Sequence, residues 1–367
     1  MLPIKKYLIH RNHDQKMKKI ILDCELMKFR NSGLYHYCLN LGLHVNKLLD
    51  SSGSDLGLSY YVPENEQKAF DKNTIVERKV HKFIKPFLFN CRLWHAPFQS
   101  GRIIPHSKKI KVLLTIHDLN QLHEGKPVEQ QRKSLAHTQQ LIDRSDAIVC
   151  ISEFTKNDVI HNCEIGNKPL YVIHNGIHDV CKKIQCLPLV IPKGDFLYGM
   201  GYVNAKKNFH VLIPLLKNNP NLEMVIAGRL DEPDYIDAMK VEAKKMGVSE
   251  RLHITGPVSE NDKSWYLRNC IAFMHPSLAE GFGAPVVEAM QFGKPLFLSN
   301  RTALPEIGAN AAFYFSDFCE EKMHFTFREG MKEFKEKRME SMVMQRATEF
   351  NWEKNALKYI EVYKSLL

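Results

Sequence analysis

Short apolar runs alternate with longer amphipathic stretches along most of the chain. This alternation is typical of β-α-β units that build a parallel sheet covered by helices. In the first half, strands are predicted at residues 19–24, 92–96, 111–117, 147–152 and 170–175, with helices between them.

The alternation breaks at "CKKIQCLPLVIPKGD" (181–195), where prolines and a glycine interrupt the periodicity, and then it starts again. In the second half, strands are predicted at 196–201, 222–228, 251–256, 271–277 and 295–299, and helices at 208–218 and 233–247. The pattern therefore predicts two doubly wound α/β domains in tandem, whose shared cleft is the natural ligand site.

The boundaries follow from the same pattern. Since "MKKIILDCEL" begins as the first strand of a domain, the residues before it are interpreted as an N-terminal extension. The expected segments are an extension (1–16), a first domain (17–180), a linker (181–195), a second domain (196–347) and a C-terminal helix (348–367). A chain of 367 residues suits two domains of about 150 to 200 residues each.

Composition and charge add two constraints. Nine cysteines without C-x-x-C spacing favour reduced thiols, and no apolar run reaches the roughly 18 residues of a membrane span, so a cytoplasmic protein is expected. The net charge of +10 is uneven, at +8 over residues 1–180 and +2 over the rest. An anionic surface, either membrane or nucleic acid, could explain the basic first half, but so could a charge excess that only aids solubility.

Glycine-rich turns do not support a nicotinamide dehydrogenase. "GMGYVN" (199–204) lacks the third glycine of G-x-G-x-x-G, and "GFGAPV" (281–286) carries proline where the helix would begin.

The segment "HPSLAEGFGAPVVEAMQFGKP" (275–295) has a better explanation. Gly281 and Gly283 allow backbone to come close to a ligand, and Pro285 suits the first turn of a helix whose free N–H groups could meet a phosphate. Glu280 and Glu288 flank this turn, where each carboxylate could accept hydrogen bonds from vicinal hydroxyls. A nucleotide sugar has a hydroxyl-bearing group on each side of its diphosphate, so it could donate hydrogen bonds to both Glu280 and Glu288. The alternative is that Glu288 only complements a helix N-terminus and Glu280 is solvated.

The same segment resembles the E-x7-E signature of retaining glycosyltransferases of the family 4 type, which have the two-domain GT-B architecture. Other segments resemble that family in the same order, more closely in the second domain than in the first. They are "RNSGLYHY" (30–37), "WHAPF" (94–98), "TIHDL" (115–119), "HNGI" (174–177), "GYVNAKKNFHVLI" (201–213), "VIAG" before Arg229, and "TALPEIGANAAFYF" (302–315).

The resemblance implies roles for single residues of the second domain. Glu288 would bind the ribose hydroxyls of the donor, Glu280 the hydroxyls of the transferred sugar, and Lys207 the diphosphate. The turn of Gly281, Phe282 and Gly283 would supply backbone donors. Many relatives carry an arginine where this chain has Gly201, so Lys207 would need help from Lys206 or Arg229.

For the first domain, the resemblance implies that His117 contacts the transferred sugar, with Asp118 as an orienting partner. A structural histidine is the alternative. His95 and Gly33 are further candidates for the acceptor side of the cleft, and Ser152 is interpreted as a helix cap. No D-x-D motif occurs, so no metal and no cofactor besides the nucleotide sugar are expected. In this family the leaving phosphate is thought to help deprotonate the acceptor.

Two amphipathic segments complete the prediction. In residues 76–89, apolar positions at helical spacing alternate with Lys79, Lys82 and Lys85, which suggests a basic helix resting on anionic lipid. A helix packed on the sheet is the alternative, and Pro86 opposes a long helix. Residues 348–367 are expected to form a helix that crosses back onto the first domain; a plain helix of the second domain is the alternative.

Together these features predict a retaining, metal-independent hexosyltransferase. It would move a sugar such as mannose from a nucleotide diphosphate to a saccharide acceptor, lipid-linked, in surface polysaccharide assembly such as that of O-antigen, capsule or lipopolysaccharide. The expected location is the cytoplasm, with peripheral attachment to the plasma membrane. The alternatives are a nucleotide-sugar epimerase of the same architecture and a non-catalytic nucleotide-sugar or nucleic-acid binding protein. No nucleic-acid module is recognisable, and no nucleic-acid partner is expected.

Overall fold

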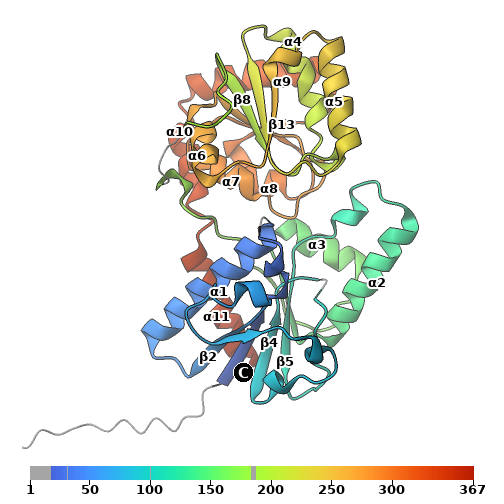
Figure 1. Ribbon diagram of the computed structural model, residues 1–367, viewed down its shortest axis with the longest axis vertical. Coiled ribbons are helices and arrows are strands. Elements are labelled where there is room, and N and C mark those ends of the chain that lie inside the picture. The colour runs from blue at the N-terminus through green and yellow to red at the C-terminus, as the bar shows by residue number, and fades with distance from the viewer. Residues whose placement is uncertain (1–17, 31, 100, 183–186) are drawn as a thin grey trace, which may run out of the picture.

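The computed structural model describes residues 18–30, 32–99, 101–182 and 187–367, which form two α/β lobes stacked end to end (Figure 1). The predicted N-terminal extension lies outside the described residues. Each lobe contains one fully parallel sheet with helices on both faces, which confirms the predicted pair of doubly wound domains.

The first sheet has seven strands in the order β3-β2-β1-β4-β5-β6-β7. Its strands are β1 (Lys18–Asp23), β2 (Leu56–Val62), β3 (Thr74–Val76), β4 (Cys91–Ala96), β5 (Lys111–Ile116), β6 (Ala147–Cys150) and β7 (Leu170–Val172). Helix α1 (Gly33–Ser52) packs on one face, and α2 (Val128–Arg144) and α3 (Glu153–Asn162) pack on the other. Five of these strands match the predicted ones; β2 and β3 are additional.

The second sheet has six strands in the order β10-β9-β8-β11-β12-β13. They are β8 (Phe196–Met200), β9 (Glu223–Ala227), β10 (Leu252–Gly256), β11 (Ala272–His275), β12 (Leu296–Ser299) and β13 (Phe313–Phe315). One face is covered by α4 (Ile213–Asn218), α5 (Pro233–Lys245) and α9 (Glu320–Glu336). The other is covered by α6 (Glu260–Asn269), α7 (Ala284–Met290), α8 (Leu304–Gly308) and α10 (Glu340–Ala347). All five predicted strands are present, and β13 is additional.

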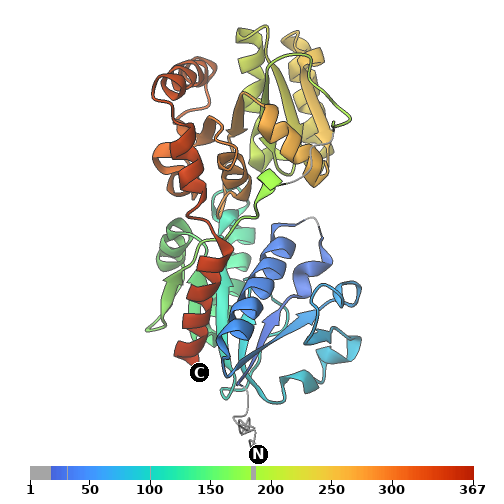
Figure 2. The ribbon, with the colours of Figure 1, turned by 90° about the vertical axis from the view of Figure 1, so that its left-hand side faces the viewer.

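The C-terminal helix α11 (Trp352–Leu366) lies against α1 of the first domain, as Figure 2 shows. The Tyr359 hydroxyl is 2.6 Å from that of Tyr37, and Trp352 packs so closely on Gly176 that a Cβ there would lie 2.4 Å from the indole. The predicted crossover is therefore confirmed, and it ties the end of the chain to the first core.

Residues 76–89 do not form the predicted amphipathic helix, so that prediction is wrong. Strand β3 ends at Val76, and two short 3-10 helices follow, η3 (Lys79–Lys82) and η4 (Pro86–Leu88). Pro86 starts the second of these, because proline cannot donate the backbone hydrogen bond that a continuous helix needs there. Within the described residues, no helix combines the length and the hydrophobicity needed to cross a bilayer.

Candidate donor and acceptor site

The loop between β11 and α7 carries the first candidate carboxylate. Strand β11 ends at His275, and Gly283 caps α7 with a φ of 92°, a left-handed conformation that favours glycine. A Cβ at Gly283 would lie 2.8 Å from the Leu304 side chain. The loop is further fixed by the Glu280 N–H, which donates to Thr302 Oγ1 at 2.9 Å.

Glu280 accepts hydrogen bonds from two neighbouring side chains, Lys207 and His275. Its Oε1 accepts a hydrogen bond from Lys207 Nζ and another from His275 Nε2 at 2.8 Å. Burial acts to raise the pKa of Glu280, but Lys207 and His275 outweigh it and hold that pKa well below its ordinary value. Burial also lowers the pKa of His275, so at neutral pH a neutral imidazole donates to an ionised carboxylate.

Lys207 owes its position to two glycines. It ends the 3-10 helix η7 (Ala205–Lys207), and its side chain runs past Gly201, where a Cβ would lie 3.1 Å from Lys207 Cε. Gly201 has a φ of 148°, and its carbonyl oxygen would lie 1.9 Å from a Cβ on Gly228. Glycine at position 201 therefore leaves the path of the lysine open.

Glu288 lies in a second, different environment. Its Oε1 accepts from Lys263 Nζ at 2.9 Å, while Oε2 is buried without a hydrogen-bond partner among the described residues. Burial raises the pKa of Glu288, and Lys263 offsets this only in part. The buried hydroxyl of Tyr198 also has no such partner. A buried carboxylate oxygen with unused acceptor capacity is costly unless a ligand supplies a donor.

The two domains meet at the glycine loop. A Cβ at Gly281 would lie 2.2 Å from the His117 carbonyl oxygen and 3.0 Å from Asp118 Cβ, so only glycine permits this approach. Lys206 reaches from the second domain to Glu124 of the first, with 3.1 Å between Nζ and Oε1. The structure thus brings His117, Asp118 and Lys206 next to the Glu280 loop.

His117 is buried after β5, and its Nε2 donates to the Pro97 carbonyl at 2.9 Å. Burial lowers the pKa of His117 to about 4, so the ring is neutral at pH 7 and Nδ1 is its acceptor nitrogen. Asp118 Oδ1 accepts from the Asn120 N–H at 3.1 Å, and burial raises the pKa of this carboxyl. Both residues are held by first-domain backbone, so they form a rigid wall opposite Gly281.

Three candidates lie apart from this group. His95 is fully buried, with Nδ1 2.8 Å from the Tyr363 hydroxyl and Nε2 2.8 Å from Thr115 Oγ1, so its contacts belong to the packing of α11. Arg229 is half exposed, pairs with Asp231 at 2.7 Å and lies over the Tyr202 ring.

Gly33, the third, is the first residue of α1, and a Cβ there would meet nothing within 4 Å. Three residues along that helix, His36 is an electrostatic neighbour of Glu260 and Lys263, next to Glu288. Helix α1 of the first domain therefore faces the Glu288 group of the second.

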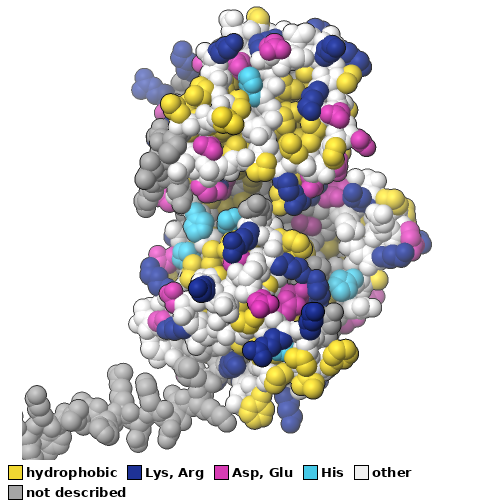
Figure 3. Space-filling model, viewed as in Figure 1, with side chains coloured by type: hydrophobic (Ala, Val, Ile, Leu, Met, Phe, Trp, Pro, Cys, Tyr) yellow, Lys and Arg dark blue, Asp and Glu magenta, His cyan; other side chains and the backbone are white. Residues whose placement is uncertain are grey.

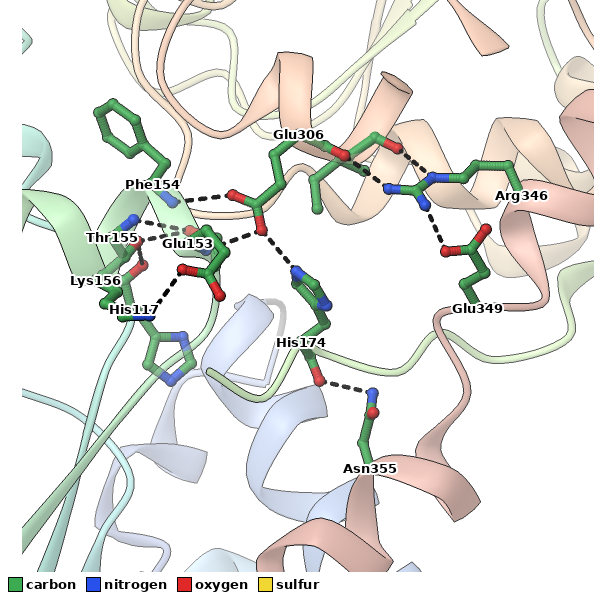
Figure 4. A network of polar contacts seen from close by, with 12 residues as sticks. His117, Glu153, Phe154, Thr155, Lys156, His174, Glu306, Arg346, Glu349 and Asn355 are labelled. Atoms are coloured by element: carbon green, nitrogen blue, oxygen red, sulfur yellow. Dashed lines mark hydrogen bonds and ion pairs between the residues drawn. The ribbon is translucent and has the colours of Figure 1, made fainter. Parts of the chain in front are cut away.

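A further network joins the domains beside Phe282, which is buried between His174 and Phe350. The Glu306 carboxylate of α8 accepts from the N–H groups of Glu153 and Phe154 at the start of α3, at 2.8 and 2.9 Å, as Figure 4 shows. His174 Nε2 adds a contact of 2.6 Å. Burial acts to raise the pKa of Glu306, but these donors lower it overall.

Four of these residues were not predicted from the sequence: His275, Lys263, Glu124 and Glu306. His275 opens the quoted motif, and Glu306 lies within "TALPEIGANAAFYF", so motif position was a usable signal for both. Lys263 and Glu124 have no local signal for the site, because Glu288 lies 25 residues from Lys263 in the chain and Lys206 lies 82 residues from Glu124. Among the described residues, no group of three His, Cys, Asp or Glu could hold a metal ion.

Comparison with known proteins shows which families the two halves of the chain match. The family described as "Glycosyl transferases group 1" matches residues 190–366, and "Glycosyltransferase Family 4" matches residues 59–179. O-antigen chain mannosyltransferase B of Escherichia coli is 23% identical over 398 residues, which cover 95% of this chain and all of that protein. Serotype-specific mannosyltransferase WbdA of Escherichia coli is 28% identical over 179 residues, covering 45% of this chain. That match spans 22% of WbdA, about a fifth of its length.

Solved structures show the same architecture. Sucrose-phosphate synthase from Thermosynechococcus elongatus superposes with a TM-score of 0.71 at 14% identity, covering 95% of this chain and 99% of that one. Anabaena Alr3699/HepE, solved in complex with UDP-glucose, gives 0.71 at 16% identity, covering 95% and 99%. At these identities the likeness shows the fold alone.

Proposed function

Because the chain belongs to the group 1 glycosyltransferases of GT-B architecture, we propose that it transfers a hexose, with mannose as the first candidate, from a nucleotide diphosphate sugar to a saccharide acceptor. The observation that carries the proposal is the pair of carboxylates in one loop-helix unit, one paired at Oε1 with Lys207 and His275 and one with a buried oxygen unused.

In the proposed complex, Glu288 Oε2 accepts from a ribose hydroxyl of the donor. This supplies the hydrogen bond that its burial otherwise leaves unmade. The ammonium group of Lys207, which pairs with Glu280, then also pairs with the diphosphate. Negative charge grows on the diphosphate as the glycosidic bond breaks. Glu280, still held by His275, then accepts from hydroxyls of the transferred sugar.

The first domain is proposed to supply the acceptor side. His117 and Asp118 face the Gly281 loop, so a sugar bound there would lie between them and Glu280. The approach of the domains at Gly281 would exclude water, which otherwise hydrolyses the donor. Retention of anomeric configuration and independence of a metal ion are part of the proposal, as the resemblance implies.

The relatives suggest the pathway. Two are named as O-antigen or serotype-specific mannosyltransferases, and a structural neighbour is titled a lipopolysaccharide outer core galactosyltransferase. We therefore propose a lipid-linked saccharide acceptor at the cytoplasmic face of the plasma membrane, in the assembly of a surface polysaccharide. None of the relatives named above is described as an epimerase or as a non-catalytic binding protein.

A thermal-shift screen against nucleotide sugars tests the donor class, because a ligand that binds the folded state raises the melting temperature. Donor consumption is then followed with and without saccharide acceptors. Acceptor-dependent release of nucleoside diphosphate is expected. Epimerisation of the donor without an acceptor, or stabilisation by nucleic acid alone, would contradict a transferase.

A further inference from the structure

The segment of residues 78–92, which begins after Glu77, the residue that follows β3, and extends into the first two residues of β4, combines positive charge with exposed apolar side chains. It contains five Lys or Arg and no Asp or Glu. This segment, called the basic-apolar segment below, runs through the two 3-10 helices η3 and η4.

Four large apolar side chains of this segment are exposed. Val80 is 50%, Phe83 86%, Ile84 63% and Phe89 79% accessible. Single exposed apolar residues are ordinary, but four of this size within ten positions are not, and such clusters usually mark a surface that contacts something.

The exposure is not a sign of a loose loop. His81 and Phe87 of the same segment are buried against Tyr61 of β2, with 3.2 Å between the Tyr61 hydroxyl and His81 Nδ1 and 4.8 Å between the rings of Tyr61 and Phe87. The buried His81 and Phe87 anchor the segment on the sheet. Phe83 and Ile84, which lie between them, project into solvent.

The positive charge of the segment is also uncompensated. Arg78, Lys79 and Arg92 are exposed and Lys85 is half-buried. The salt bridges of the first domain engage other cations, such as Lys72, Arg102 and Lys111, and within the described residues no carboxylate pairs with these four. Four unpaired cations beside four exposed apolar side chains are complementary to a partner whose outer layer is anionic and whose interior is apolar.

The segment lies on the first domain. Strand β4 begins at Cys91, and the carboxyl ends of the parallel strands face the second domain, so Phe89 lies toward the opposite end of the sheet. Figure 3 shows hydrophobic and basic side chains side by side at that end of the molecule.

We propose that the basic-apolar segment docks the protein on an anionic lipid bilayer. Lysine and arginine would lie among the lipid phosphates, while Phe83, Ile84 and Phe89 would enter the boundary with the acyl chains. A bilayer suits this surface because it accepts irregularly placed apolar groups without a complementary groove. The surface itself does not depend on the transfer reaction; its purpose, to hold the first domain beside a lipid-linked acceptor, rests on the proposed function.

The test is co-sedimentation of the full chain with vesicles of phosphatidylcholine alone or mixed with phosphatidylglycerol. Binding is expected only to the mixed vesicles, and salt should weaken it. Lys79→Glu with Lys85→Glu should lower the partition coefficient by about tenfold or more, since each basic residue near an anionic surface contributes about fivefold. Phe83→Ser with Phe89→Ser should lower it by about tenfold, because two apolar anchors are lost.

Matched controls lie on the second domain. Lys332→Glu with Lys335→Glu makes the same charge change on the exposed side of α9, and Phe325→Ser removes an exposed phenylalanine of the same helix. These variants should bind as the unaltered protein does. The proposal is overturned if the protein ignores protein-free anionic vesicles, as a docking site for another protein would, or if segment and control variants bind alike. Donor consumption with a soluble acceptor, measured in parallel, reports on the transferase proposal independently.

Discussion

Glu280 and Glu288 lie in one loop-helix unit, yet the structure gives them opposite surroundings. Glu280 Oε1 accepts hydrogen bonds from both Lys207 and His275, and the pKa of Glu280 lies well below the ordinary value. Glu288 has one cation, Lys263, and one buried oxygen without a partner, and burial raises its pKa.

The contrast separates two kinds of binding residue. A carboxylate that is already ionised and paired is a fixed charge that orients a lysine before any ligand arrives. A carboxylate that is buried and half-paired gains most from a ligand that donates hydrogen bonds. On this basis we propose that Glu280 acts at the reacting centre and that Glu288 binds the part of the donor that remains bound throughout.

The largest loss of activity should come from substituting Lys207 or Glu280. Lys207→Ala should lower kcat by about 100- to 1000-fold, because the charge that stabilises the departing diphosphate is lost. Glu280→Gln should likewise abolish detectable transfer. Both are measured as acceptor-dependent release of nucleoside diphosphate, with circular dichroism to confirm the fold. Full turnover by either variant would remove this assignment.

The next effect tests the contact between the domains. Gly281→Val should lower kcat by about 100-fold, because any side chain there collides with the His117 carbonyl and holds the cleft open. Nucleotide affinity, which depends on the second domain, should change far less. Small-angle scattering should show a larger radius of gyration for the variant. An unchanged radius together with lost nucleotide binding would mean local damage to the loop instead.

A smaller effect, the pH dependence of ligand affinity, should distinguish Glu288 from Glu280. The raised pKa of Glu288 means that protonation competes with ligand binding above the ordinary glutamate range, so nucleoside diphosphate affinity should fall as the pH is lowered from neutrality toward that range. Because Glu280 has a lowered pKa, it stays ionised over that window. Isothermal titration calorimetry of the protein and of Glu288→Gln measures the difference. A fall in affinity that survives in Glu288→Gln would come from another group.

The smallest effect should be at Arg229. It is half exposed and already paired with Asp231, and surface pairs contribute little, so Arg229→Ala should change kcat/KM by less than about threefold. The same assay as for Lys207→Ala provides the comparison. A loss as large as that of Lys207→Ala would show that Arg229 swings onto the diphosphate when the donor binds.

Much of the fold was predictable because it repeats a strong pattern. Ten strands and the crossover helix follow from apolar periodicity, and the cap of α3 at Ser152 follows from residue type, since its Oγ accepts from the Thr155 N–H at 3.1 Å. Strands β2, β3 and β13 were not predicted, the first because tyrosines and a serine blur its apolar run and the other two because three residues carry little pattern.

The site was predictable only in part, for a different reason. Residue type and spacing single out Glu280 and Glu288, and the family resemblance adds Lys207; their roles remain predictions. Residue type and spacing do not reveal that Lys206 pairs with Glu124 across the domains, or that His95 packs against Tyr363, because such contacts depend on how distant segments meet. The short helices of residues 78–92 were also missed, since helical spacing of apolar residues was stronger than the single signal from Pro86.

The most direct test of the division between the two carboxylates is calorimetric titration of a nucleoside diphosphate and its sugar derivative into the protein, Glu280→Gln and Glu288→Gln. Glu288→Gln should weaken both ligands alike, by about 10- to 100-fold, because both carry the ribose. Glu280→Gln should weaken only the sugar nucleotide. Equal losses of both ligands in the Glu280 variant, or unchanged binding in the Glu288 variant, would contradict the separate roles proposed for the two acids.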